Sequence, residues 1–304
     1  MRGSKSMDPK ILSGKECAAS VNAETQAMAE KYIEKYGIAP ALAVILIGDD
    51  PASCVYVNSK AQKCVELGLR SEKFLLDKDA TMEEVLSLID KLKNDPTIHG
   101  ILVQSPPPPQ IDEEKVIAAI DPAKDVDCFH ALNVGKMLIG KTDGFFPCTP
   151  YGVLKILEYY NIDPAGKHVV VIGRSNIVGK PLMALMVQKA KGANATVTCV
   201  HSGTKDLASY TRQADILIAA IGKSEFVKAD MVKEGAVVID VGINRIPDAT
   251  KKSGSRLTGD VAYAEVAPKS SAITPVPGGV GPMTIAMLMR NTVRAALMAA
   301  GEKL

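Results

Sequence analysis

The segment VVVIGRSNIVGKP, from Val169 to Pro181, combines an apolar run ending in glycine, a polar loop, a second glycine and a proline. The apolar run predicts a buried strand, and the proline suits the first turn of a helix. Backbone amides at such a helix N-terminus attract phosphate groups. The glycines, Gly173 and Gly179, do not form the G-x-G-x-x-G fingerprint of dinucleotide-binding folds. A purely structural strand-loop-helix is therefore the alternative to a nucleotide site.

Three more apolar runs, ATVTCVH, DILIAAIG and AVVIDVG, follow this segment and predict further strands of one parallel sheet. Ligands of such sheets bind at the carboxyl ends of the strands. Arg174 follows the first strand directly, and the second ends in His201, where NAD-specific folds usually have an acid. An arginine beside this position pairs with a 2′-phosphate, which favours NADP over NAD. A solvated loop arginine is the alternative.

The half of the chain before this segment reads as strand, helix, strand, helix and strand, from ALAVILIG at Ala41 to HGILVQ. The first helix has Asp50 as its predicted N-cap, Pro51 in its first turn and Gly68 just beyond its end. This spacing places Tyr56 and Lys60 on one helical face. The pattern predicts a second parallel α/β layer.

These patterns predict an α/β protein of two domains, which suits a length of 304 residues. We expect an N-terminal three-layer α/β domain over residues 7–150, completed by a helix over residues 282–304. A Rossmann-like domain with a parallel sheet is expected over residues 151–281. The run from Pro275 to Thr284, PVPGGVGPMT, has too many glycines and prolines for a helix or a strand.

Composition favours small-molecule chemistry, because 36 basic and 34 acidic residues are mixed throughout the chain. This mixture predicts no nucleic-acid partner and no membrane partner, and no apolar run approaches the roughly 20 residues of a membrane span. The opening MRGSKS is set aside as an expression leader. No metal site is predicted. Reduced thiols in a cytoplasmic compartment are expected from scattered cysteines without a Cys-x-x-Cys pair: Cys17, Cys54, Cys64, Cys128, Cys148 and Cys199.

Several side chains of the first domain are candidates for chemistry. The Tyr-x-x-x-Lys spacing of Tyr56 and Lys60 is familiar from short-chain dehydrogenases, which place it after their nucleotide fold; here it comes before. A partly desolvated lysine can act as an acid or a base, whereas most helix lysines are solvated. Gln104 ends the strand HGILVQ at an edge suited to orienting a side chain. Asp127, in KDVD, can accept two hydrogen bonds from an aminopyrimidine-type edge, and Asp125 is the expected loop cap of the pair.

Taken in order, the motifs SCVYVNSK, HGILVQ, KDVD, PCTP, GRSNIVGKP, GDVAY and ITPVPGGVGPMT resemble those of the bifunctional methylenetetrahydrofolate dehydrogenase/cyclohydrolase family, the FolD-type enzymes. The resemblance covers essentially the whole chain after the leader. It implies oxidation of 5,10-methylenetetrahydrofolate with NADP and hydrolysis of the methenyl product to 10-formyltetrahydrofolate in the same cleft. It also implies a homodimer formed through the nucleotide domain.

The resemblance implies roles for individual residues. Lys60 matches the catalytic lysine and Gln104 its partner. Tyr56 matches the tyrosine that stacks on the folate, and Asp127 the carboxylate that grips the pterin. Further substrate contacts are implied for Pro277, Gly278 and Gly279. Cofactor contacts are implied for Gly173, Arg174, Ser175, Ile177, Val178, His201, Ser202, Gly222, Gly242, Ile243 and Thr284.

The chain departs from the family pattern at two points. Cys128 stands where the family usually has glycine after KDVD, and SPPPPQ replaces a Leu-Pro-Leu-Pro type of run. We expect an altered loop conformation with activity retained. The alternatives are an NADP-dependent dehydrogenase of another small substrate and a catalytically silent protein that binds nucleotide or folate. The first leaves KDVD and VPGGVGPMT unexplained, and intact Lys60, Gln104 and Asp127 argue against the second.

Overall fold

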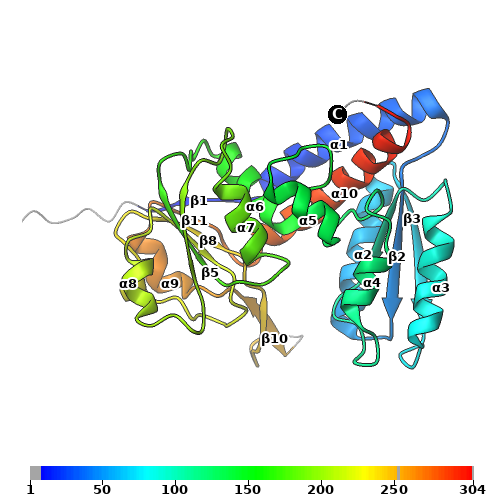
Figure 1. Cartoon of the computed structure of the whole chain (residues 1–304). Helices are drawn as coiled ribbons and strands as arrows, with labels where there is room; N and C mark the ends of the chain where they lie inside the picture. Colours follow the sequence, from blue (N-terminus) through cyan, green and yellow to red (C-terminus); the bar gives the residue numbers. More distant parts are fainter. Residues whose placement is uncertain (1–7, 252–253, 303–304) are drawn as a thin grey trace, which may run out of the picture. The chain divides into compact units, whose positions relative to one another are not determined.

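The computed structural model describes residues 8–251 and 254–302 and divides into two compact units (Figure 1). The unit that we call six-stranded, after its main sheet, comprises the described residues up to Ala18 and Thr149–Thr284. The three-stranded unit comprises Ala19–Cys148 and the described residues from Ile285 onward. Helices α1 (Gly14–Tyr36) and α10 (Val280–Ala299) contribute residues to both units. The predicted fold class, α/β with two domains, is confirmed.

The three-stranded unit is built on a parallel sheet with the order β3-β2-β4. Every residue of the central strand is buried, because strands flank it on both edges and the sequence ALAVILI is apolar throughout. The strands are β2 (Ala41–Ile47), β3 (Arg70–Leu76) and β4 (Gly100–Val103). The helices are α2 (Pro51–Glu66), α3 (Met82–Lys93), α4 (Glu113–Ala119) and α5 (Ala131–Leu138).

Local sequence sets both ends of α2, as predicted. The Asp50 carboxylate accepts a hydrogen bond of 2.8 Å from the Ser53 backbone N–H, and Pro51 occupies the first turn. Gly68 follows the helix with φ of 75°, a left-handed conformation that glycine adopts without strain. The helix that carries Tyr56 and Lys60 is therefore positioned by its own caps.

The six-stranded unit contains a parallel sheet with the order β1-β11-β8-β7-β5-β6. Its strands are β1 (Lys10–Ile11), β5 (His168–Ile172), β6 (Thr196–Val200), β7 (Ile216–Ala219), β8 (Val237–Asp240) and β11 (Ala272–Ile273). An antiparallel hairpin joins β9 (Asn244–Pro247) to β10 (Ser255–Thr258). The helical segments are α6 (Cys148–Tyr159), α7 (Gly179–Met186), α8 (Leu207–Thr211), η1 (Ala229–Met231), α9 (Tyr263–Val266) and η2 (Ala267–Lys269).

The first strand differs from the expectation that residues 7–150 begin the first domain. Lys10 and Ile11 pair in parallel with Ala272 and Ile273, so the described residues up to Ala18 belong to the six-stranded unit. A two-residue strand has no periodicity to detect, and its partner lies far away in the sequence. The long helix α1 that follows was not predicted either.

The start of α10 corrects the prediction that PVPGGVGPMT is too rich in glycine and proline for a helix. The helix begins at Val280 and therefore includes Gly281 and Pro282. A proline is tolerated in the first turn because the backbone N–H groups there have no partner within the helix. Further along, α10 lies beside α1 within the three-stranded unit (Figure 1), where Arg290 forms an ion pair of 2.9 Å with Glu24.

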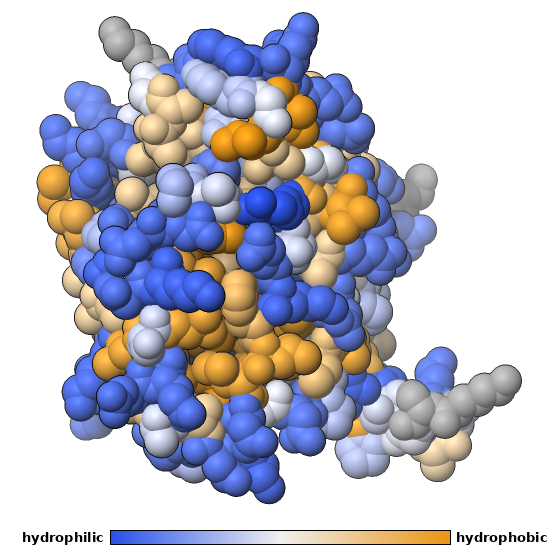
Figure 2. Space-filling model, turned by 90° about the vertical axis from the view of Figure 1, so that its right-hand side faces the viewer, coloured by the Kyte–Doolittle hydropathy of each residue, from blue (hydrophilic) through white to orange (hydrophobic). Residues whose placement is uncertain are grey.

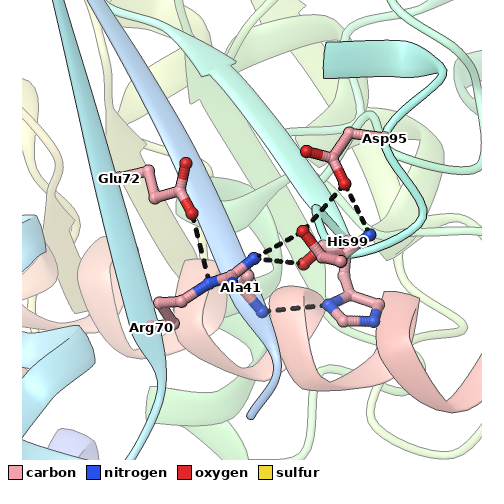
Figure 3. Close-up of polar contacts among 6 residues, drawn as sticks. Ala41, Arg70, Glu72, Asp95 and His99 are labelled. Atoms are coloured by element: carbon pink, nitrogen blue, oxygen red, sulfur yellow. Dashed lines mark hydrogen bonds and ion pairs between the residues drawn. The ribbon is translucent and has the colours of Figure 1, made fainter. Parts of the chain in front are cut away.

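Two groups of polar contacts lie at the amino end of the three-stranded sheet, as Figure 3 shows. His99 Nδ1 accepts a hydrogen bond of 3.0 Å from the Ala41 backbone N–H, so a neutral ring has its proton on Nε2, which lies 3.3 Å from the Tyr32 hydroxyl. Arg70 donates to the backbone oxygen and the hydroxyl of Thr97. Burial lowers the pKa of His99 to about 4. These contacts hold the amino ends of β2, β3 and β4 together and contain no group assigned to chemistry.

The surface combines charged and apolar side chains. Figure 2 shows hydrophilic residues over much of one face, with apolar areas between them. Among the large apolar side chains of residues 8–251 and 254–302, Val65, Leu75 and Ile139 are the most exposed. Isolated exposed apolar residues are normal on protein surfaces. Among the described residues, no helix has the length and apolar character that crossing a membrane requires.

Candidate active site and nucleotide-binding edge

The half-buried lysine of α2 contacts the glutamine that follows β4. Lys60 Nζ donates a hydrogen bond of 3.0 Å to Gln104 Oε1, which confirms that the two side chains meet. Gln104 is itself held in place, because its backbone N–H donates to the Ile45 carbonyl and its amide donates 2.8 Å to the Ser105 carbonyl. Tyr56, one turn before Lys60, is 42% exposed. The lysine amine is therefore oriented, while the tyrosine ring is open to a ligand.

Asp127 is the acidic member of the same cluster. Among the described residues its carboxylate has one hydrogen-bond partner, the Cys148 thiol, with Sγ 3.6 Å from Oδ1. Desolvation raises the pKa of Asp127, and the nearby Lys60 charge and the Cys148 thiol oppose this shift. A half-buried carboxylate with so few partners retains capacity to accept hydrogen bonds from a ligand.

Asp125, two residues earlier, has the opposite environment. It is 3% exposed and accepts hydrogen bonds from the backbone N–H groups of Phe129 and His130, at 3.0 and 2.9 Å, and from the Asn133 amide at 2.8 Å. Burial raises its pKa to about 6, an effect that these three donors partly offset. The expectation that Asp125 is the cap of the pair is confirmed, because its oxygens fix the turn before α5.

Cys128 occupies a left-handed backbone conformation with φ of 61°. A glycine at this position would adopt this φ without strain, whereas other residues pay roughly 1–2 kcal/mol. The cysteine is buried, and its thiol donates to the Phe145 carbonyl at 3.2 Å. The departure from the family pattern is thus accommodated by a buried thiol contact.

A pocket of the three-stranded unit adjoins this cluster. It lies between the end of β4, the proline-rich loop Ser105–Gln110, α4 and the loop that contains Lys124–Asp127. Its lining combines apolar side chains with the polar groups described above, and consists of Ile101, Leu102, Val103, Gln104, Pro107, Glu113, Val116, Ile117, Ile120, Asp125, Asp127 and Phe129. An apolar pocket with a few polar groups is typical of a small-molecule site.

In the six-stranded unit, close packing explains the two glycines of VVVIGRSNIVGKP. A Cβ on Gly173 would lie 2.2 Å from the Ala220 carbonyl oxygen, and one on Gly179 would lie 2.2 Å from the Gly173 oxygen. Ser175 Oγ accepts hydrogen bonds from the backbone N–H groups of Val178 and Gly179, at 3.1 and 3.4 Å, at the start of α7. Ile177, at the tip of this loop, is 49% exposed. The loop is thus held tightly at the carboxyl end of β5.

Arg174 and His201 face each other at the neighbouring strand ends. Arg174 Nη1 lies 3.4 Å from His201 Nε2, and His201 Nδ1 accepts a hydrogen bond of 3.1 Å from the Gly203 backbone N–H. A guanidinium group has donors only. Arg174 therefore places a donor next to the ring that precedes exposed Ser202. Such a donor fits an anion such as a phosphate.

The remaining predicted cofactor residues follow β7 and β8 or begin α10. Gly222 has φ of 70° and Gly242 donates its backbone N–H to Asp240 Oδ1 at 3.0 Å. Ile243 is 44% exposed. The Thr284 hydroxyl lies 2.8 Å from the Thr149 hydroxyl. The structure thus places Gly222, Gly242 and Ile243 at the carboxyl edge of the sheet.

The glycine-rich turn before α10 packs on the start of α1. The Gly278 carbonyl accepts a hydrogen bond of 2.9 Å from the Gly14 backbone N–H, and a Cβ on Gly14 would lie 1.6 Å from the Gly279 oxygen. These glycines therefore serve close packing of two backbones. Pro277, Gly278 and Gly279 belong to the six-stranded unit, whereas Lys60, Gln104 and Asp127 belong to the three-stranded unit.

Sequence reasoning did not assign roles to four residues that organise these sites. Cys148 and Asn291 surround the Asp127 segment, with Asn291 donating 2.7 Å to the Val126 carbonyl. Asp240 and Asp260 hold the loops of the nucleotide edge. The motifs PCTP and GDVAY contain Cys148 and Asp260 and marked their positions, but the partners lie on other elements. No cluster of metal-ligating side chains occurs within the described ranges.

Comparisons with known proteins agree with this geometry. Residues 12–127 match the catalytic domain model of tetrahydrofolate dehydrogenase/cyclohydrolase, and residues 147–300 match its NAD(P)-binding domain model. The bifunctional protein FolD of Chlorobium luteolum is 58% identical over 286 residues, which cover 94% of this chain and 97% of that protein.

Solved structures give the same result. The bifunctional FolD enzyme of Campylobacter jejuni is 49% identical, with a TM-score of 0.89 over 94% of this chain and 98% of that chain. The Trypanosoma brucei FolD structure, which is complexed with NADP cofactor and an inhibitor, is 34% identical, with a TM-score of 0.91 over 97% and 99% of the two chains. The chain therefore belongs to the tetrahydrofolate dehydrogenase/cyclohydrolase family.

Proposed function

We propose that this chain oxidises 5,10-methylenetetrahydrofolate with NADP and hydrolyses the methenyl product to 10-formyltetrahydrofolate, with Lys60, Gln104 and Asp127 at the folate site. The observation that carries this proposal is a lysine amine oriented by Gln104, whose charge acts on a nearby carboxylate that has spare hydrogen-bonding capacity. The family membership supplies the reaction pair.

Asp127 is proposed to bind the pterin. An ionised carboxylate accepts two parallel hydrogen bonds from an aminopyrimidine edge, and Asp127 has one weak thiol partner among the described residues. Tyr56, exposed on the same helical face as Lys60, is proposed to stack on the folate. These contacts fix the one-carbon group relative to the lysine.

The oxidation step needs mainly orientation. NADP, when bound, would supply the acceptor for the hydride of the one-carbon bridge. The chain contributes the carboxyl edge of the six-stranded sheet, where the Ser175 hydroxyl fixes the loop that begins α7. This helix N-terminus is proposed to bind a phosphate of the cofactor. Arg174, with His201 beside it, is proposed to bind the 2′-phosphate of NADP.

The hydrolysis step needs a group that moves a proton to or from water. Lys60 is the proposed proton carrier, because its amine is half-buried and Gln104 restrains it at 3.0 Å. Gln104 accepts from the amine and therefore sets the direction of the lysine side chain. Asp127 lies near enough for the Lys60 charge to stabilise its ionised form.

A lysine substitution tests this assignment. Lys60→Met keeps the stem length and removes the amine, so we expect loss of cyclohydrolase activity with unchanged NADP binding. The measurement is the decay of methenyltetrahydrofolate absorbance, together with NADP titration by calorimetry. Lys63→Met is the matched control, because Lys63 is on the same helix and pairs with Glu66. Normal cyclohydrolase turnover in Lys60→Met would refute the role of Lys60.

A homodimer and a cytoplasmic location complete the proposal. The dimer is supported by the family resemblance, and the location by six cysteines that are all free thiols. Residues 19–148 with the end of α10 are proposed as the folate domain, and residues 149–284 as the NADP domain. Sedimentation of the purified chain at several concentrations measures the oligomeric state directly.

A further inference from the structure

Two buried carboxylates, Asp240 and Asp260, hold the loops of the nucleotide edge, and neither has a part in the proposed function above. Asp260 is fully buried and Asp240 is 4% exposed. Both lie within the six-stranded unit, Asp240 at the end of β8 and Asp260 shortly after β10. A buried carboxylate needs several hydrogen-bond donors, so their partners show which segments they hold together.

Asp260 gathers the loop after β7. Its Oδ2 accepts from the backbone N–H groups of Ile221 and Gly222, at 2.7 and 2.9 Å. Its Oδ1 accepts from the Lys223 N–H and from the Asn244 amide, both at 2.9 Å. Three consecutive backbone amides thus wrap around one carboxylate and fix the path of the loop that contains Gly222.

Asp240 joins this arrangement to the loop after β8. Its Oδ1 accepts from the backbone N–H groups of Gly242 and Asp260, at 3.0 and 2.9 Å, and its Oδ2 accepts from the Val261 N–H at 2.9 Å. The carboxylate therefore holds the backbone of Asp260 itself. Asp240 at the end of β8 thus holds the backbone of Asp260, and the Asp260 carboxylate in turn holds the loop after β7.

The glycines at this edge are explained by the same carboxylates. A Cβ on Gly242 would lie 2.2 Å from Asp260 Oδ1, and a Cβ on Gly259 would lie 1.8 Å from Asp240 Oδ2. Side chains at these positions would displace the carboxyl groups. The loops that contain Gly222, Gly242 and Ile243 therefore pack directly against the two carboxylates.

We propose that Asp260, held by Asp240, is a positioning residue for NADP, which presents the Gly222 loop and the Gly242–Ile243 loop to the cofactor. This inference rests on the proposed function, because those loops are the proposed cofactor contacts. The two carboxylates accept hydrogen bonds from backbone N–H groups and the Asn244 amide and are not catalytic. Cyclohydrolysis consumes no NADP, so the effect of Asp260 separates the two activities.

An isosteric substitution of Asp260 tests the inference. Asp260→Asn replaces one carboxylate oxygen with an NH2 group. In one orientation of the amide this group faces the Ile221 and Gly222 N–H groups, and in the other it faces the Lys223 N–H. Donors that face donors displace the loop. We expect the Kd for NADP, measured by calorimetry, and the KM for NADP to rise by about tenfold or more. Cyclohydrolase turnover of methenyltetrahydrofolate should remain within about twofold of the unchanged protein.

A control variant and a second variant complete the test of the inference. Asp230→Asn, an exposed aspartate of the same unit, is the control and should leave both activities unchanged. Asn244→Ala, which removes one of the four donors to Asp260, should raise the KM for NADP in the same direction by a smaller factor and serves if Asp260→Asn does not fold. An unchanged Kd for NADP in both variants overturns the inference, as does an equal fall of both activities. An unmodified chain without dehydrogenase activity would instead contradict the proposed function.

Discussion

The carboxyl edges of the two sheets use aspartates in opposite ways. At the edge of the three-stranded sheet, Asp127 has one thiol partner among the described residues and lies near the lysine amine. At the edge of the six-stranded sheet, Asp260 is surrounded by four donors. A carboxylate with spare capacity can bind a ligand, whereas a saturated one can only shape the backbone. Hydrogen-bond saturation thus distinguishes a binding group from a scaffold group.

Asp125 and Asp127 of the KDVD motif differ in the same way, in the number of donors that each carboxylate has. Asp125 is saturated by three donors and caps the turn before α5, while the Asp127 carboxylate has only the Cys148 thiol as a partner among the described residues. Both carboxyl groups have a raised pKa because both are desolvated. Burial alone therefore does not identify the binding residue; the number of donors does.

The largest expected effect is at Asp127. Asp127→Ala should weaken folate binding by about a hundredfold or more, because two charge-assisted hydrogen bonds to the pterin are lost. NADP binding and the free energy of unfolding should change little. The measurements are folate and NADP titrations by calorimetry and urea unfolding at pH 7.

Asp125→Ala is the matched contrast within the same loop. It leaves two backbone N–H groups and the Asn133 amide without their acceptor, so we expect a loss of about 3 kcal/mol in the free energy of unfolding. Folate affinity per folded molecule should be nearly retained. If the two substitutions exchanged their effects on stability and affinity, the comparison of the two aspartates would be wrong.

A smaller effect is expected at Arg174. Arg174→Ala should lower kcat/KM with NADP by roughly tenfold to a hundredfold and leave kcat/KM with NAD nearly unchanged, because only NADP has the 2′-phosphate. Arg212→Ala, which removes an arginine that contacts the Asp230 carbonyl, is the control. Equal losses with NADP and NAD would show that Arg174 does not recognise the phosphate, and an unmodified chain that prefers NAD would contradict the cofactor assignment.

The smallest effect on catalysis is expected at the amino end of the three-stranded sheet. The pKa of His99 is lowered to about 4, so the folded state keeps the ring neutral while the unfolded chain takes up a proton near pH 6.5. The resulting contribution to stability is present above pH 6.5 and is lost as the pH falls towards 4. Between pH 7 and 5 we expect a loss of about 2 kcal/mol from this group.

His99→Asn tests this pH dependence. The asparagine oxygen can accept from the Ala41 N–H in place of Nδ1, without a titrating ring. Urea unfolding at pH 7 and pH 5 should show a smaller loss on acidification than the unchanged protein, with both activities retained at pH 7. An identical loss in the two proteins would assign the acid sensitivity to other groups.

The sequence by itself determined the elements whose causes are local. The Asp50 cap, Pro51 and Gly68 set α2, and hence the common face of Tyr56 and Lys60, because capping bonds reach only three or four residues. The apolar runs predicted the principal strands, and the ordered motifs indicated the family. The turn cap at Asp125 is local as well, since its donors are within eight residues.

Only the tertiary structure decided which distant groups meet. It joined the two-residue β1 to β11, brought Cys148 to Asp127, and placed the Asp260 carboxylate on amides that precede it by 37 to 39 residues. It also showed that Gly242 and Gly259 are needed beside buried carboxylates. These features depend on packing between separate elements, and a single sequence carries no local periodicity or cap that reports such contacts.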